Sequence, residues 1–206
     1  MENYINQIRK DIDLLPLNHV FVAKDFTGNI EYETARKILR RLDEREEIKK
    51  IARGYYYKPT FLPIINDYSR PDIESYAKAI ARNMNWRIFP SGNTALNVFG
   101  LSTQVPANYS YISSGRTITY SINTNTISFI HRTSRETDLS YITGTLIQAL
   151  KALGHHNISD DIIKKISKAL SCSNKEIILE EAKMTSAWIY DVIKKICKGE
   201  KNDYHS

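Results

Sequence analysis

The stretch from Ile30 to Pro59 constrains the fold more than any other, and it reads IEYETARKILRRLDEREEIKKIARGYYYKP. Its first half spaces apolar residues as a helix does, and its second half has a short apolar and basic run, IKKIA, before an Arg-Gly pair and three tyrosines. Glycine supplies the positive φ that a tight hairpin turn needs. A helix followed by a basic hairpin is the order of elements in a winged helix-turn-helix, so we expect that fold at the N-terminus.

The helix expected over residues 31–44 has two chemically different sides. At about 100° per residue, Ala35, Ile38, Leu39 and Leu42 share one buried stripe. Long cationic side chains on the other side match what DNA recognition needs, because arginine pairs with guanine through two hydrogen bonds and either cation binds phosphate. The residues that we expect to face DNA, from this helix and the following hairpin, are Thr34, Arg36, Lys37, Arg40, Arg41, Lys49, Lys50 and Arg53.

A second interpretation of the same helix is a solvated charged surface. Five acids lie among the cations and could pair with them at helical spacing: Glu33, Asp43, Glu44, Glu46 and Glu47. The attached hairpin favours the DNA interpretation over this one. Tyr55, Tyr56 and Tyr57 could stack on unpaired bases, but we expect the alternate tyrosines to pack beneath the hairpin and Tyr56 to face water.

The bulk charge permits nucleic-acid binding without locating it. The chain has 206 residues, a formal net charge of +6 and a pI near 9.2. The excess is spread evenly, since residues 1–60, 61–142 and 143–206 each carry +2. No apolar run approaches the roughly 18 residues of a membrane span, and the polar N-terminus lacks the apolar core of a secretory signal. We therefore expect a cytoplasmic protein with no membrane partner.

The chain is predicted to be α+β with two domains. Residues 1–62 would form the winged helix-turn-helix, and residues 69–206 would form a second domain after the turn-rich segment TFLPIINDYSRP. Period-two segments at 109–113, 117–122 and 126–130 predict a small antiparallel sheet. From Leu139 onward the apolar period is helical, so a helical bundle should complete the C-terminal domain.

The motifs of common enzymes and metal sites are missing from the sequence. There is no phosphate-binding glycine loop, no zinc-binding helix motif, and Cys172 and Cys197 are too few for a zinc site. We therefore expect no cofactor, no metal and no catalytic activity. The polar residues that could serve a nucleic-acid-modifying enzyme are Ser91, His131, Arg132 and Arg135.

Two segments together resemble a known family. The wing-like IKKIARGYYYKP is similar to the Arg-Gly-x-Tyr wing of AbiEi-like antitoxins. The segment FPSGNTALNVFGLSTQVP, followed by the strands YSYIS, RTITYSI and ISFIHR, resembles the turn, short helix and strand meander of the same family. The resemblance covers most of residues 1–135.

The resemblance implies an antitoxin of a type IV toxin–antitoxin system. Its winged helix would bind inverted repeats in the double-stranded DNA of its own promoter and repress the operon. The rest of the chain would counteract a nucleotidyltransferase-like toxin without needing a stable complex. Two other functions stay open from the residues alone: a generic winged-helix repressor, and a protein-interaction adaptor that uses the winged helix without DNA.

Overall fold

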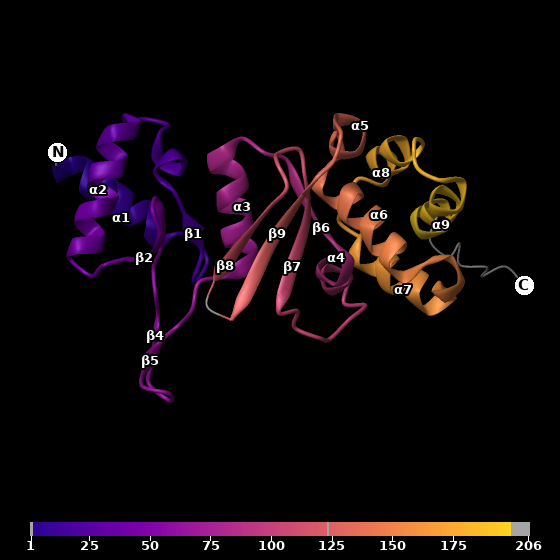
Figure 1. The fold of residues 1–206 in the computed structure, drawn as a ribbon, viewed down its shortest axis with the longest axis horizontal. Coiled ribbons are helices and arrows are strands. Elements are labelled where there is room, and N and C mark those ends of the chain that lie inside the picture. Colours follow the sequence, from indigo (N-terminus) through magenta and orange to yellow (C-terminus); the bar gives the residue numbers. More distant parts are fainter. Residues whose placement is uncertain (1, 123, 199–206) are drawn as a thin grey trace, which may run out of the picture. The chain divides into compact units, whose positions relative to one another are not determined.

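The computed structural model describes residues 2–122 and 124–198, and it mixes helices with small sheets (Figure 1). It divides into two compact units, Met1–Trp86 and Arg87–Ser206. The prediction of a mixed α and β chain with a helical C-terminal region is confirmed.

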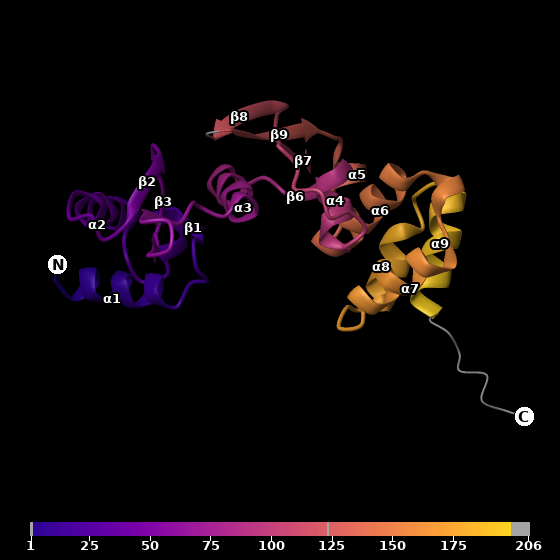
Figure 2. The same ribbon diagram turned by 90° about the horizontal axis from the view of Figure 1, so that it is seen from below.

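The N-terminal unit surrounds a small antiparallel sheet with helices (Figures 1 and 2). Its sheet has the order β1-β3-β2, and Ile8, Phe21, Leu39 and Ile48 are among the residues of its apolar core. The elements of this region are α1 (Glu2–Asp13), β1 (Val20–Phe21), the short 3₁₀ helix η1 (Ala23–Phe26), α2 (Tyr32–Glu44), β2 (Lys49–Ala52) and β3 (Tyr55–Tyr57).

The three tyrosines of β3 are all buried, which corrects the expectation that Tyr56 faces water. Tyr56 belongs to the core that α2 also lines. Tyr55 lies edge-on to Tyr76, with ring centroids 5.3 Å apart, and the Tyr57 hydroxyl donates to the Ser69 carbonyl at 3.2 Å. Side chains alternate along a strand, so β3 is covered on both faces and offers no stacking surface for bases.

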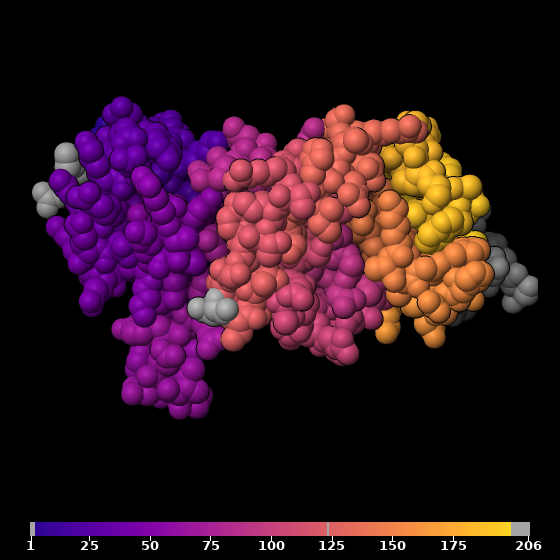
Figure 3. Space-filling view, in the orientation of Figure 1, coloured from indigo at the N-terminus to yellow at the C-terminus, as the bar shows by residue number. Residues whose placement is uncertain are grey.

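The segment expected to be a linker, residues 60–71, contains a second hairpin. Strands β4 (Phe61–Leu62) and β5 (Asp67–Tyr68) pair antiparallel, and Asn66 adopts a positive φ of 48° in the turn. The hairpin projects from the rest of the N-terminal unit (Figures 1 and 3). Its large apolar side chains are exposed, with Ile64 fully so at 100%. We call it the apolar hairpin, and these side chains are Phe61, Leu62, Ile64, Ile65 and Tyr68.

Helix α3 (Ile73–Met84) packs on the N-terminal unit, whereas the sequence placed it in a second domain that began at residue 69. The Val20 amide donates to the Ser75 hydroxyl at 2.8 Å, inside the unit. The Arg82 guanidinium donates to both Asp25 carboxylate oxygens, at 2.8 and 2.9 Å. These contacts join residues more than 50 positions apart, so periodicity along α3 could not reveal them.

The C-terminal unit begins with a four-stranded sheet of order β6-β7-β9-β8. The prediction that this sheet is antiparallel is wrong in one pairing, because β7 and β9 run parallel from Asn108↔Thr126 to Ser113↔His131. Strand β8 takes the outer edge and β9 returns between β8 and β7, which forces the parallel pairing. The elements are β6 (Ile88–Ser91), α4 (Gly92–Val98), β7 (Asn108–Ser113), β8 (Ile118–Ile122) and β9 (Asn125–His131).

The remaining helices pack into one apolar core, which includes Leu146, Ile166, Ile178 and Ile193. Helix α6 lies close to β6, where a Cβ added to Gly144 would stand 2.5 Å from the Phe89 ring. Figure 2 shows α4 and α6 beside the β6 side of the sheet. The helices are α5 (Ser134–Thr137), α6 (Tyr141–Leu153), the 3₁₀ helix η2 (His155–Asn157), α7 (Asp160–Ala169), α8 (Lys175–Ala182) and α9 (Ala187–Lys198).

Candidate nucleic-acid interface

Helix α2 buries the stripe that the sequence predicts. Ala35, Ile38, Leu39 and Leu42 are at most 1% exposed. The side chains on the opposite side face solvent, except for Thr34, which is half-buried. We call this side the α2 face, and it consists of Thr34, Arg36, Lys37, Arg40 and Arg41. The buried stripe fixes the rotation of the helix, and that rotation presents the cations outward.

Acids on α2 pair with two of its arginines. Arg36 lies 3.2 Å from Glu33, and Arg40 lies 3.1 Å from Glu44. All four side chains are about half exposed or more, so each pair contributes about 0.5 kcal/mol or less. Exchanging so weak a pair for a phosphate or a base edge costs little. The predicted pairing of acids with cations is therefore present, and it leaves the arginines available to a stronger anionic partner.

The hairpin of β2 and β3 follows α2 directly, and we call it the basic hairpin. Gly54 has a φ of +86° at its turn, as the sequence predicts. Lys49, Lys50 and Arg53 are exposed on it. The Lys49 ammonium lies 3.9 Å from the centre of the Tyr68 ring, so a cation–π contact joins the basic hairpin to the apolar hairpin.

Two contacts tie the basic hairpin to α2. The Lys50 amide donates to the Asp43 carboxylate at 3.0 Å, which joins β2 to the last turn of the helix. Burial raises the pKa of Tyr56, Asp43 raises it further, and the nearby Arg36 and Arg40 lower it. Tyr56 of β3 is also buried in the core that α2 lines, which is the second contact. The structure thus brings the eight predicted residues onto neighbouring elements of one folded unit.

The sequence missed two features of this unit. The apolar hairpin was taken for a linker, although an Asn-Asp turn between Phe61-Leu62 and Tyr68 is a recognisable hairpin signal. The ion pair between Arg9 on α1 and Glu47 before β2, at 2.5 Å, was also missed. Arg9 donates through both Nε and Nη2, and this hydrogen bonding lowers the pKa of Glu47. Residues 38 positions apart leave no local signal for such a pair.

The polar residues proposed for an enzyme do not form one cluster. In the sheet Ser91 pairs with Ser110, while His131 pairs with Ser113 three positions further along β7. The Ser91 hydroxyl donates to Ser110 at 2.9 Å, and His131 Nδ1 lies 2.7 Å from the Gly115 carbonyl. A serine and a histidine held apart in this way cannot act as nucleophile and base on one substrate.

Two kinds of feature are absent from residues 2–122 and 124–198, the part of the chain that the structure describes. No helix there is both long and apolar enough to cross a membrane. No group of three or more His, Cys, Asp or Glu side chains is placed to hold a metal ion among these residues.

The chain belongs to a family of unknown function, DUF6088, whose model matches residues 7–178. Curated proteins show no match to it. Among solved structures, the chain is similar to the crystal structure of the RV2827C protein from Mycobacterium tuberculosis, with 9% identity and a TM-score of 0.41. That similarity covers 95% of this chain and 76% of the other. The family match spans most of both units.

Proposed function

We propose that this protein is a DNA-binding autorepressor with an antitoxin role, in which the N-terminal unit acts as a winged helix-turn-helix. The observation that carries the proposal is the α2 face, a cationic surface directly opposite a fully buried stripe and tied to a basic hairpin. The order of elements, with two helical segments before the hairpin and a sheet of order β1-β3-β2, supports a winged helix.

In this proposal α2 is the recognition helix and enters the major groove. Arg36 and Arg40 are long enough to reach base edges from an exposed helix surface, and Lys37 and Arg41 contact phosphates. Lys49, Lys50 and Arg53 extend the phosphate contacts along the neighbouring backbone. Thr34, at the first turn of α2, is placed to donate to a phosphate near the start of the contact.

A gel shift with the protein's own upstream DNA tests this surface. Arg40→Glu with Lys50→Glu should lower the affinity by about 100-fold or more, since each lost contact costs about 1–3 kcal/mol and the new acids repel phosphate. The matched control is Lys10→Glu with Arg116→Glu, which makes the same change of charge on one exposed lysine and one exposed arginine outside the proposed surface. If the folded Arg40/Lys50 variant binds as the wild type does, the proposed surface is wrong.

The antitoxin role rests on the resemblance to AbiEi-like proteins. It predicts a nucleotidyltransferase-like toxin encoded beside this chain, whose growth inhibition is relieved when the two are expressed together. Relief should survive Arg40→Glu with Lys50→Glu, because the proposal assigns neutralisation to the rest of the chain and repression to the winged helix. Growth inhibition that persists with the full wild-type chain would contradict the antitoxin role and leave the DNA proposal standing.

The apolar hairpin favours a second candidate, a protein-interaction adaptor. Ile64 and Ile65 are 100% and 63% exposed at its tip, and exposed apolar side chains grouped in this way are typical of protein-binding surfaces. As an adaptor, the chain would co-purify with a protein and show no salt-dependent retention on DNA. Ile64→Ser with Ile65→Ser would then release the protein partner. The same variant should bind DNA normally if the first proposal is right.

A further inference from the structure

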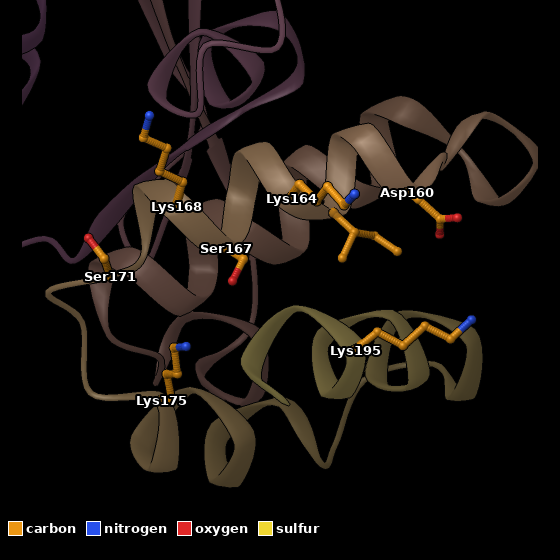
Figure 4. Close-up of a pocket in the computed structure, with 8 residues that line it drawn as sticks. Asp160, Lys164, Ser167, Lys168, Ser171, Lys175 and Lys195 are labelled. Atoms are coloured by element: carbon orange, nitrogen blue, oxygen red, sulfur yellow. The ribbon is translucent and has the colours of Figure 1, made fainter. Parts of the chain in front are cut away.

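A cleft of about 610 Å³ lies among α7, α8 and α9 of the C-terminal unit. Lysines from all three helices line it, together with Ser167 of α7 and Ser171, which follows that helix (Figure 4). We call it the lysine cleft, and its polar donors are Lys164, Ser167, Lys168, Ser171, Lys175 and Lys195. In Figure 4, Ser167 and Lys175 point into the gap between their helices, Lys164 and Lys195 extend in a common direction, and Lys168 points away at the rim.

The spacing on α7 explains how the cleft arises. Ser167 lies three residues and Lys168 four residues after Lys164, so these side chains follow one side of the helix. The buried Ile166 and Leu170 hold the other side in the core. Lys164 of α7, Lys175 of α8 and Lys195 of α9 line the same cleft.

The charges in the cleft are poorly balanced by the protein. Asp160 is the one acid in the lining, against four lysines. Within residues 2–122 and 124–198, Lys168, Lys175 and Lys195 form no ion pair with an acid. Neighbouring lysines do have such partners, because Lys183 pairs with Glu180 and Lys194 with Asp191. Like charges that share a concave space repel each other, and an anionic ligand would relieve that repulsion.

The size and chemistry of the cleft indicate the class of ligand. Its volume lies in the range of about 300–1,000 Å³ that is typical of small-molecule sites. Ammonium and hydroxyl groups are donors that suit phosphate oxygens, and several ammonium groups suit a chain of phosphates better than a single one. Ile163 gives the lining an apolar side chain that a base or sugar could contact. We propose that the lysine cleft binds the polyphosphate chain of a nucleoside triphosphate.

Calorimetric titration of the full chain with ATP, in buffer without divalent cations, tests this proposal. The wild type should bind ATP and inorganic triphosphate but not adenosine, because the phosphates carry the recognition. Lys175→Ala with Lys195→Ala should weaken ATP binding by about 10-fold or more, since each charge-assisted contact contributes about 1.5–3 kcal/mol. Lys165→Ala with Lys198→Ala is the matched control, because it removes two exposed lysines of α7 and α9 outside the cleft lining and should change affinity less than about twofold.

Three outcomes would overturn the proposal. The first is no ATP binding by the wild type, and the second is an equal loss in both double variants. The third is binding of a single-stranded oligonucleotide that ATP does not displace and that Lys175→Ala with Lys195→Ala abolishes, which would make the cleft a contact for a nucleic-acid backbone. None of these variants changes the α2 face, so failure of this proposal and failure of the DNA proposal are distinguishable.

Discussion

The α2 face and the lysine cleft each gather four basic side chains, yet they differ in residue type, shape and partners. On α2 three of the four are arginines, they stand on a convex helix surface, and acids of the same helix pair with Arg36 and Arg40. In the cleft all four are lysines and they line a concave space with one acid. Residues 143–206 contain no arginine at all.

These differences suit two different ligands. Arginine presents a planar set of donors that can pair with a base edge, and a convex helix fits a groove. Lysine is a compact point charge without such geometry, so several of them around a cavity suit phosphate groups of a small ligand. The two proposals therefore assign equal numbers of cations to different tasks, the reading of a DNA groove on α2 and the recognition of phosphate charge in the cleft.

The largest expected effect comes from the cores that hold the two surfaces. Leu39 of α2 and Ile166 of α7 are both 0% exposed. Leu39→Ala and Ile166→Ala should each lower the free energy of unfolding by about 2–5 kcal/mol, because each leaves a cavity. The matched controls are Leu14→Ala and Ile177→Ala, at residues that are 85% and 48% exposed. Chemical denaturation that finds equal losses in core and control variants would contradict the burial of both stripes.

Exchanging arginine and lysine tests the comparison itself. Arg36→Lys with Arg40→Lys keeps the charge of the α2 face but removes the paired donors. Discrimination between the promoter and unrelated DNA should fall by about 1–3 kcal/mol per lost base contact, while binding to unrelated DNA changes little. The reverse exchange, Lys175→Arg with Lys195→Arg, should leave ATP binding within a few-fold. Competition titrations measure both, and unchanged discrimination in the Arg36/Arg40 variant would refute base reading by α2.

A substitution at the turn of the basic hairpin should have a smaller effect on stability. Gly54 has a φ of +86°, and a Cβ there would meet no atom within 4 Å, so the cost of Gly54→Ala is conformational. We expect a loss of about 1–2 kcal/mol in unfolding free energy and weaker DNA binding. Gly28→Ala is the control, since Gly28 also has open space but no positive φ. A thermal denaturation in which the two variants behave alike would show that the turn does not need glycine.

The smallest expected effect is on the pH dependence of the free energy of unfolding. Burial, with a further contribution from Arg82, lowers the pKa of His19 from its usual 6.5, and His19 Nδ1 lies 3.1 Å from the Ser75 hydroxyl. Below that usual value the unfolded chain binds more protons than the folded one, so the free energy of unfolding of the N-terminal unit should fall as the pH drops through this range. His19→Gln should flatten this dependence. Denaturation curves at about pH 7.5 and pH 5.5 measure it, and an equal slope in the variant would exclude His19 as the cause.

The sequence could predict features that repeat locally, and it missed those that depend on contacts between distant residues. The α2 stripe was predictable because Ala35, Ile38, Leu39 and Leu42 recur at helical spacing, and the turn at Gly54 because glycine is needed there. The docking of α3 was not, since its hydrogen bond from Val20 to Ser75 joins distant segments. The parallel pairing of β7 with β9 was also missed, because period-two alternation indicates strands without their order.

The two cationic surfaces differ in the same way in how far the sequence could predict them. The α2 face lies within eight consecutive residues, so a helical projection displays it. The lysine cleft collects side chains from residues 164 to 195, and it exists only once α7, α8 and α9 have packed together. The even charge along the chain locates neither surface, because net charge per segment carries no information about which side chains share a face.

The salt dependence of promoter binding tests the central claim most directly, namely that the N-terminal unit carries the DNA contacts. Fluorescence anisotropy should give a Kd that weakens linearly with salt on a double logarithmic plot. Lys49→Ala with Lys50→Ala should reduce that slope by about 2, because each phosphate contact contributes about 1. Lys175→Ala with Lys195→Ala should leave it unchanged. A slope that falls with the cleft variant and stays constant with the hairpin variant would contradict the account.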